Sequence, residues 1–387
     1  MFSRRTHWSF EKNPLLVRLE EIRRLGQRVI DLTGSNPTHG VAYPDTEILK
    51  PLAAAQNMVY APSAMGTLKA RQAIARYYQG KSVVVEPERI FLTASTSEAY
   101  AFLFRLLTNP GQKVLAPRPS YPLFEYLAQL NDIELNYYSL VYDRRWGVDV
   151  GSLKRAMTED TRAILFVNPN NPTGSFLRRN ELEAINELCR RYQAAFICDE
   201  VFGDYGFDQD DATVPTVCGN KMALTFSLAG ASKTLGLPQM KVAWGTVSGP
   251  ETLVRESCER LEVILDTYLS VNTPVMNALP HWFSLRSQIQ GNIMNQLKEN
   301  RNFLRQRIRD ATGVELLNGE GGWSAILRLP VETDEEELAM TLLEKDSVFI
   351  HPGYFFDFET GSHIVISLLP DPTLFKEGID RVVSRFC

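Results

Sequence analysis

Short apolar runs alternate with longer amphipathic stretches along most of this 387-residue chain. The runs are rich in Val, Ile, Leu and Phe, as expected of strands that are buried on both faces of a sheet. The amphipathic stretches repeat their apolar positions every three or four residues, which is typical of helices. This alternation predicts an α/β fold with helices on both faces of one sheet. The predicted strands span residues 90–93, 113–116, 133–138, 163–167, 195–198, 222–226 and 242–247.

The helical pattern is clearest in five stretches, of which the last two form a long pair that we expect to link two domains. After Thr312 the hydrophobic pattern changes and predicts short strands at 322–329 and 363–369 around a helix at 334–344. This pattern indicates a smaller α+β domain. Residues 31–37 are expected to join it. We therefore predict a large domain over 36–275 and a small domain built from 1–35 and 276–387. The five predicted helices span residues 67–78, 97–107, 181–192, 251–269 and 277–311.

Composition narrows the class of protein without identifying it. Apolar residues make up 44% and charged residues 22%, as in ordinary globular proteins. The formal net charge of -5 comes with scattered Lys and Arg, so no basic patch for nucleic acid or anionic lipid is expected. No stretch resembles a signal peptide or a membrane span, which predicts a cytoplasmic protein. The five cysteines lack metal-like spacing, so neither a metal site nor a disulfide framework is expected.

Three of the apolar runs are followed by a polar residue of a different chemical type, namely Asn171, Asp199 and Lys233. Ligands of open α/β sheets bind beyond the carboxyl ends of the strands, where these residues fall. A lysine can form a Schiff base, a carboxylate can keep a pyridine nitrogen protonated, and an amide can bond a phenolate oxygen. Pyridoxal phosphate requires these three functions of its protein. The trio therefore predicts a pyridoxal phosphate site.

The surroundings of the trio support this interpretation. Residues 93–99 are a strand end followed by hydroxyl residues that open a helix, which can bind phosphate through backbone N–H groups. An ordinary helix N-cap is the alternative. Around Asn171, two prolines and Gly174 give the loop a rigid shape. Asp199 follows apolar residues and would need a cationic partner, although a helix-capping role is open to it.

Lys233 is flanked by small and apolar residues from Gly230 to Leu237. Such surroundings lower the pKa of an amine, so that it can act as nucleophile and proton carrier near neutral pH. A solvated surface lysine is the alternative. Lys241 follows at a distance over which a loop could fold back and place a second cation near the phosphate.

In this order the motifs resemble the class I and II aminotransferases, pyridoxal phosphate enzymes of fold type I, from about Asp31 to the C-terminus. The resemblance implies a seven-stranded, mostly parallel sheet flanked by helices, with a smaller α+β domain. It also implies that Lys233 forms the Schiff base and then carries the proton, that Asp199 pairs with the pyridine nitrogen, and that Asn171 bonds the ring hydroxyl. The other cofactor-binding residues that it implies are Ser95, Thr96, Ser97, Tyr121, Phe202, Tyr205, Ser232 and Lys241.

The resemblance also implies roles for two tyrosines and for the N-terminal loop. Tyr121 matches an aromatic residue that stacks on the pyridine ring, with a core tyrosine as the alternative. Tyr60 matches a tyrosine that reaches the phosphate of the neighbouring subunit, which implies a homodimer with shared active sites. The N-terminal loop that lines the substrate pocket corresponds to Gly34, Ser35 and Asn36.

Three positions depart from the commoner family pattern. Phe202 replaces a tyrosine, so the ring oxygen loses a donor unless Tyr205 or a water replaces it. Lys241 replaces an arginine on the phosphate side. Val365 replaces the arginine that clamps the substrate α-carboxylate. Either another residue binds the carboxylate or the substrate has no carboxylate in the usual place, and the sequence leaves both open. The candidates for the carboxylate are Arg118, Arg328, His351 and His363.

The predicted activity is ping-pong transfer of an amino group from an amino acid to a 2-oxo acid through the Lys233 Schiff base. A pyridoxal phosphate-dependent lyase of the carbon–sulfur β-lyase type uses the same residues and is the alternative. A regulator that fuses this fold to a DNA-binding domain is disfavoured, because no basic helix-turn-helix segment precedes Asp31. Aromatic residues at 321–323 and 353–356 either border a substrate cleft or serve packing.

Overall fold

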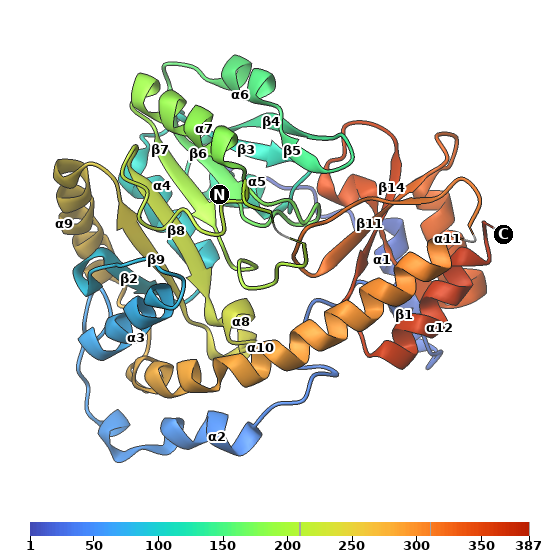
Figure 1. Cartoon of the computed structure of the whole chain (residues 1–387), viewed down its shortest axis with the longest axis horizontal. Helices are drawn as coiled ribbons and strands as arrows, with labels where there is room; N and C mark the ends of the chain where they lie inside the picture. Colours follow the sequence, from blue (N-terminus) through green and yellow to red (C-terminus); the bar gives the residue numbers. More distant parts are fainter. Residues whose placement is uncertain (209, 310, 387) are drawn as a thin grey trace.

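The computed structural model describes residues 1–208, 210–309 and 311–386. All seven predicted strands lie in one sheet, to which an eighth, short strand is added at the edge. The predicted α/β architecture is therefore confirmed (Figure 1). The strand order across the sheet is β2 (Ile90–Thr93), β9 (Ala243–Ser248), β8 (Thr225–Gly230), β7 (Ala195–Asp199), β6 (Thr161–Val167), β3 (Lys113–Arg118), β4 (Glu134–Tyr142) and β5 (Trp146–Val148).

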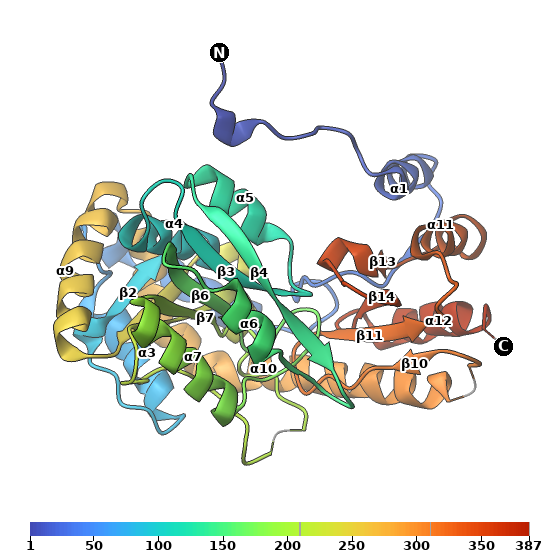
Figure 2. The same ribbon diagram turned by 90° about the horizontal axis from the view of Figure 1, so that it is seen from above.

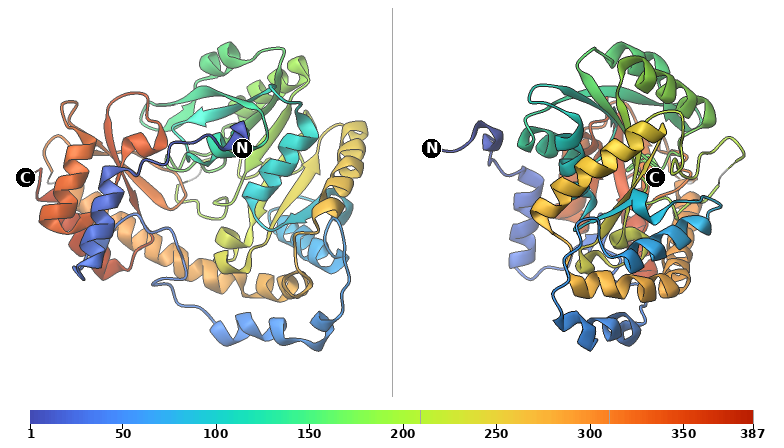
Figure 3. Two further views of the ribbon diagram at one scale, coloured as in Figure 1. Left: turned by 180° about the vertical axis from the view of Figure 1, so that it is seen from behind. Right: turned by 90° about the vertical axis from the view of Figure 1, so that its left-hand side faces the viewer.

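Strands β8, β7, β6, β3 and β4 are parallel to one another, whereas β9 and β5 pair antiparallel to their neighbours. Helices cover both faces. In Figure 1 α7 lies in front of the sheet, and in the view from behind in Figure 3 α4 lies in front of it. Their apolar faces pack on the sheet because parallel strands must be covered on both sides. These helices are α4 (Thr96–Leu107), α5 (Leu123–Leu130), α6 (Val150–Ala156), α7 (Arg179–Tyr192) and α9 (Glu251–Tyr268).

Two details of the sheet differ from the sequence prediction. Strand β8 occupies Thr225–Gly230 instead of residues 222–226, because of its last four residues only Leu228 is large and apolar, and the buried Ser227, Ala229 and Gly230 contribute little to an apolar pattern. The eighth strand, Trp146–Val148, was not predicted because three residues are too few to show a period of two.

A second, four-stranded sheet has the order β10 (Glu315–Leu316), β11 (Ser324–Leu329), β14 (Ser362–Ser367) and β13 (His351–Pro352). A separate pair, β1 (Ile30–Asp31) and β12 (Val348–Phe349), joins the N-terminal segment to this part of the chain, as predicted. The remaining helices are α1 (Pro14–Arg24), α2 (Asp45–Leu49), α3 (Leu68–Gln79), α8 (Ala231–Thr234), α10 (Thr273–Ile308), α11 (Glu335–Asp346) and α12 (Pro372–Val383). Short 3₁₀ helices lie at Arg4–Thr6, Lys50–Ala53, Ala55–Met58, Pro87–Arg89, Pro238–Met240 and Gly353–Phe356.

The long helix α10 links the two sheets and contacts α3 near one end and α12 near the other (Figure 1). The expectation that a pair of helices forms the link is wrong for α9, which packs against α4 and β9 on the large sheet. Its buried residues include Leu279, Trp282 and Leu297. The segment that precedes α1 extends away from this helix and reaches α5 (Figure 2). There Trp8 packs edge-on against Tyr126, with 5.6 Å between the ring centroids. Among the described residues, no helix is long and apolar enough to cross a bilayer, and no cluster of three metal-ligating side chains is present.

Candidate active site

The carboxyl ends of β6, β7 and β8 bring the three sequence-predicted residues to one edge of the large sheet. Asp199 is the last residue of β7 and pairs in register with Leu228 of β8 and Val167 of β6. Strand β8 ends at Gly230 and leads directly into the one-turn helix α8, which carries Lys233. Asn171 lies in the loop that follows β6. The parallel register of the three strands therefore places an amine, a carboxylate and an amide on neighbouring loops.

The amine of Lys233 is enclosed by aromatic rings and by the N-terminal loop. Its Nζ lies 4.8 Å from the ring centroid of Trp323 and 5.7 Å from that of Phe202, and it donates to the carbonyl oxygen of Ser35 at 3.3 Å. Burial lowers the pKa of Lys233 to about 8, and the nearby Asp199 carboxylate opposes this shift. A substantial fraction of this amine is consequently neutral near physiological pH. The side chain of Lys233 is half-buried, unlike that of a fully solvated surface lysine.

We expect the cofactor-free protein to show this pKa directly. Labelling with trinitrobenzenesulfonate, followed by peptide mass spectrometry, should give a half-maximal rate for Lys233 near pH 8, because only the neutral amine reacts. The exposed Lys154 in the same sample provides the reference. Identical pH profiles for the two lysines would contradict the described environment.

The carboxylate of Asp199 is buried and oriented by two hydrogen bonds. Tyr100 Oη donates to Oδ2 at 3.1 Å, and the backbone N–H of Val201 donates to Oδ1 at 3.0 Å. Burial raises the pKa of Asp199 to about 6, while the two hydrogen bonds and the charge of Lys233 oppose the shift. Asp199 is therefore buried and also makes the kind of side-chain bond to a backbone N–H that a helix-capping aspartate makes. An oriented, buried carboxylate is suited to hold a cationic ring nitrogen.

The loop after β6 is shaped by its own hydrogen bonds. Asn170 Oδ1 accepts from Thr173 Oγ1 at 2.9 Å, and Gly174 has a φ of 67°, where a side chain would also collide with the backbone of Gly321. Ser324 Oγ donates to Asn171 Oδ1 at 3.3 Å. Within the described residues the Nδ2 group of Asn171 makes no hydrogen bond, so this donor remains available to a ligand.

An aromatic wall beside Lys233 is fixed by contacts that the sequence did not reveal. Tyr205 Oη donates to the backbone carbonyl of Lys233 at 2.7 Å, and Gly322 N donates to the carbonyl of Tyr205 at 2.9 Å. Trp323 packs edge-on against Tyr205 and Phe202, at 5.1 and 5.4 Å between centroids. The bond of Tyr205 to Lys233, the bond of Tyr100 to Asp199 and the bond of Ser324 to Asn171 join segments far apart in sequence, so no local pattern signals them.

The hydroxyl residues after β2 open helix α4. Ser95 is its N-cap, with Oγ accepting from Glu98 N at 3.1 Å, which confirms the capping interpretation of this residue. The side chains of Thr96 and Ser97 make no hydrogen bond within the described residues. The first turn therefore retains free N–H and O–H donors, and a twelve-residue helix directs its partial positive charge toward this end.

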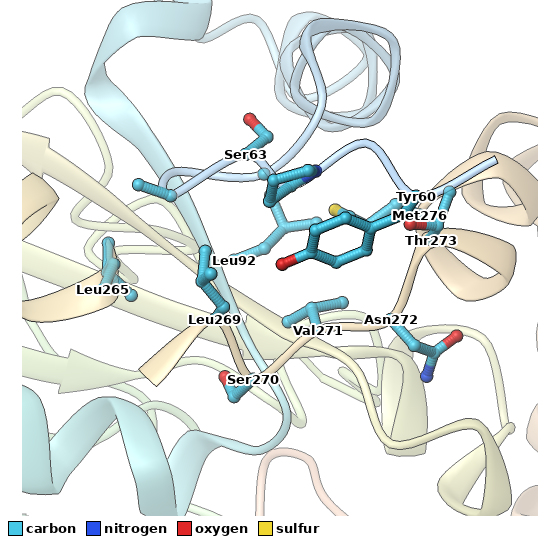
Figure 4. A pocket seen from close by; sticks show the side chains of 13 residues that line it. Tyr60, Ser63, Leu92, Leu265, Leu269, Ser270, Val271, Asn272, Thr273 and Met276 are labelled. Carbon is cyan, nitrogen blue, oxygen red and sulfur yellow. The ribbon is translucent and has the colours of Figure 1, made fainter. Parts of the chain in front are cut away.

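Three of the predicted residues make no described contact with Lys233, Asp199 or Asn171 within one chain. Lys241 is exposed and has a φ of 49°, Tyr121 is half exposed, and Tyr60 is 80% exposed. Tyr60 lines a pocket together with the α9–α10 connection, where Val271 lies beside its ring (Figure 4). Of the N-terminal loop, Ser35 contacts Lys233 and the carbonyl of Gly34 accepts from Ser367 Oγ at 2.7 Å, whereas Asn36 bonds Thr38.

Val365 lies in the middle of β14, opposite Ile326 of β11 and His351 of β13, and is almost fully buried in an apolar cluster. Burial also lowers the pKa of His351, and it lowers that of His363, which stacks on Phe358, to about 4. Both histidines are therefore neutral at physiological pH. The two arginines proposed for the carboxylate are engaged elsewhere: Arg328 pairs with Glu315, and Arg118 covers the ring of Tyr137.

These donors fit pyridoxal phosphate. A buried amine of lowered pKa, a buried and oriented carboxylate, a free amide N–H₂ and a hydroxyl-rich helix start correspond to the aldehyde, ring nitrogen, ring oxygen and phosphate of that cofactor.

Comparisons with known proteins agree with this fit. A model of the family "Aminotransferase class I and II" matches residues 28–383. The chain is 25% identical over 387 residues to the glutamate-pyruvate aminotransferase AlaA of Escherichia coli, covering 97% of this chain and 93% of that protein. It is 26% identical to the protein of the same name from Haemophilus influenzae, covering 96% and 92%. The alanine aminotransferase of Pyrococcus furiosus superposes with a TM-score of 0.90 at 22% identity, covering 100% and 99% of the two chains.

Proposed function

The chain belongs to the class I and II aminotransferase family, and on this premise we propose that Lys233 is the residue that holds its cofactor and moves the proton. The protein is a pyridoxal phosphate-dependent aminotransferase. The observation that carries the proposal for Lys233 is its buried amine, with a pKa lowered to about 8, beside the buried carboxylate of Asp199. When bound, pyridoxal phosphate supplies the electron sink that allows a substrate Cα–H bond to break.

Lys233 and the residues around it would transfer the proton and bind the cofactor. The neutral Nζ of Lys233 would accept the proton from the substrate Cα and deliver it to a carbon of the bound cofactor within the same half-reaction, so that Nζ is neutral again. In the second half-reaction Nζ would move a proton in the opposite direction. The Asp199 carboxylate, oriented by Tyr100 and Val201, would hold the ring nitrogen, and the Asn171 amide would donate to the ring oxygen. The start of α4 would bind the phosphate through Ser95, Thr96 and Ser97, and we propose that Ser232 and Lys241 would add to this site.

The aromatic wall borders the amine. Trp323 and Phe202 cover Nζ, and the bond from Tyr205 to the Lys233 carbonyl fixes the backbone of α8. Because the Tyr205 hydroxyl already donates to that carbonyl, we propose that Tyr205 positions Lys233. We propose that Asn171 would then be the principal donor to the ring oxygen. Tyr121 supplies a flat face for the ring.

We propose that the protein exchanges amino groups between amino acids and 2-oxo acids in a ping-pong cycle, as the names of its glutamate-pyruvate relatives indicate for those proteins. The lyase alternative is not supported, because the family and these relatives are aminotransferases. A half-reaction screen tests the cycle by adding one amino acid at a time to the loaded enzyme. Pyridoxamine phosphate and one equivalent of oxo acid are expected, whereas sustained release of ammonia with pyruvate would overturn the proposal.

We also propose a homodimer with shared active sites. It is supported by Tyr60, which is 80% exposed in one chain and lines a pocket about 280 Å³ in volume with few contacts of its own. An aromatic side chain left so open is suited to a partner surface. The four cysteines in the described part of the chain are free thiols, in keeping with the reducing cytoplasm that we propose as its location. We retain the domain division at residues 36–275 as a proposal, supported by the separate sheets.

Mixing two inactive variants should restore activity if the sites are shared. Tyr60→Ala removes the group offered to the partner, and Lys233→Ala inactivates the chain's own site. In a mixed dimer one of the two sites keeps both residues. With random exchange about half of the dimers are mixed, so about a quarter of the wild-type activity is expected. The assay is the turnover of the mixture against each variant alone. No recovery after verified subunit exchange would contradict sharing through Tyr60.

A further inference from the structure

A cavity of about 460 Å³ lies between the C-terminal half of α10 and the strands β10 and β11. In Figure 2, α10 and β10 run side by side at this place. Its size falls in the range of small-molecule sites, roughly 300–1,000 Å³. Lys233 and Asp199 are not among its lining residues, although Thr173 and Ser324 are, and these two also adjoin the loop of Asn171. The cavity is therefore a neighbour of the candidate active site and has its own walls.

One wall of the cavity is cationic. Arg301, Arg305 and Arg309 all line it. Arg301 and Arg305 lie on one face of α10, and Arg309, the C-cap of this helix, keeps helical backbone angles and continues the spacing of four residues. Arg301 Nη2 donates to Asp208 Oδ2 at 2.8 Å and to the carbonyl of Gly319 at 2.9 Å. Arg305 approaches the same Asp208 carboxylate at 3.5 Å. No side chain in the described part of the protein pairs with Arg309, so its donors are free for a ligand.

The carboxylates described near the cavity do not balance these charges. Asp208 is shared between Arg301 and Arg305, and Glu315, which lines the cavity, is already paired with Arg328. Among the residues that the structure describes here, four guanidinium groups thus meet two carboxylates, and an excess of positive charge remains beside a concave surface. Such a place attracts anions, and the planar guanidinium groups favour carboxylate or phosphate oxygens.

The rest of the wall is apolar, which restricts the kind of anion. The ring of Phe207 faces the guanidinium of Arg301 at 4.4 Å and forms part of this surface. A bare inorganic ion would leave the apolar surface uncovered, and a neutral apolar molecule would leave the arginines without a partner. The other apolar lining residues are Ile308, Val314, Leu316, Leu317, Ala325, Ile326 and Leu368.

We propose that this cavity binds a small organic carboxylate with an apolar or aromatic body, its carboxylate on Arg305 and Arg309 and its body against Phe207 and the apolar wall. The site is additional to the one that holds Lys233. The proposal does not rest on the function proposed for Lys233, because the arginines that it uses take no part in that chemistry.

The test is isothermal titration calorimetry of the full-length loaded enzyme with 3-phenylpropanoate. We expect saturable binding to the wild type, and binding at least tenfold weaker to the double variant Arg305→Gln/Arg309→Gln, because two charge-assisted contacts are lost. Both side chains are exposed, so the double variant should remain folded. Arg260→Gln is the matched control: Arg260 is an exposed helical arginine on α9 that pairs with Glu256, and its removal should leave binding unchanged.

Two further probes separate charge from apolar contact. Inorganic phosphate and 3-phenylpropan-1-ol should each bind at least tenfold more weakly than 3-phenylpropanoate, because each satisfies only one half of the cavity. Absence of 3-phenylpropanoate binding would overturn the proposal. Equal binding to the wild type and the double variant would also overturn it, since this would place the ligand elsewhere, including the site of Lys233. Phosphate binding as tightly as the carboxylate would show a simple anion patch and would contradict the proposed ligand class.

Discussion

Replacing Lys233 by alanine is expected to abolish turnover, by at least about 10⁴-fold, in a protein that remains folded. The change removes the only amine among the described residues that is buried beside Asp199, and with it both the covalent attachment of the cofactor and the proton carrier. Turnover, visible absorbance of the loaded protein, and mass spectrometry after borohydride reduction measure the two losses separately. The reduced wild-type protein should carry the cofactor on the peptide that contains Lys233, and the variant should carry none.

The stability of the variant has an expected sign. Folding lowers the pKa of Lys233 from its ordinary value of about 10.4 to about 8, so the folded state disfavours the protonated amine. This penalty is fully present below pH 8 and disappears as the pH rises through the unfolded-state value. Cofactor-free Lys233→Ala should therefore unfold at the same or a higher temperature than the wild type at pH 7. Lys154→Ala, on the exposed face of α6, is the control that should change neither property. Turnover retained by Lys233→Ala would refute the assignment.

Replacing Asp199 by asparagine is expected to lower kcat by about 10²–10³-fold, the usual effect of removing one preorganised electrostatic group from an enclosed site. Asparagine preserves the shape of the side chain: its oxygen can still accept from the N–H of Val201, and its NH₂ group can donate to the Tyr100 hydroxyl, which now accepts. The main change is therefore the loss of the charge. Steady-state kinetics measures the effect. A variant with wild-type kcat would show that the ring nitrogen does not depend on this carboxylate.

The same substitution has an independent readout in cofactor-free protein. The pKa of Asp199 is raised to about 6 from its ordinary value of about 3.9, so ionisation is disfavoured in the folded state. The penalty is absent below the unfolded value, grows as the pH rises between the two values, and is complete above pH 6. At pH 9, where Lys233 is neutral, Asp199→Asn should therefore unfold at a higher temperature than the wild type, and at pH 4 the two should be nearly equal. A pH-independent difference would contradict the described burial.

Much of the fold followed from local pattern. The apolar runs that became β2, β3, β6 and β7 were found within a few residues, because strands buried on both faces are apolar throughout. The long helices α9 and α10 were recognisable because many turns repeat one period. The pattern failed where the chain is short or its buried residues are small, as in β5 and the second half of β8. Burial of Ser, Ala and Gly depends on neighbouring strands, which a single sequence does not display.

By itself, the sequence determined the order of chemical groups along the chain: an amide, a carboxylate and a lysine, each just beyond an apolar run. Strand ends of a parallel sheet meet at one edge, so this order already implied one site. Only the tertiary structure decided how that site is tuned. The pKa values of Lys233 and Asp199, the hydrogen bonds from Tyr100 and Tyr205, and the cationic cavity along α10 arise from burial and from contacts between distant segments. Such effects depend on distance and solvent exclusion in space, and these physical quantities have no local signature in a sequence.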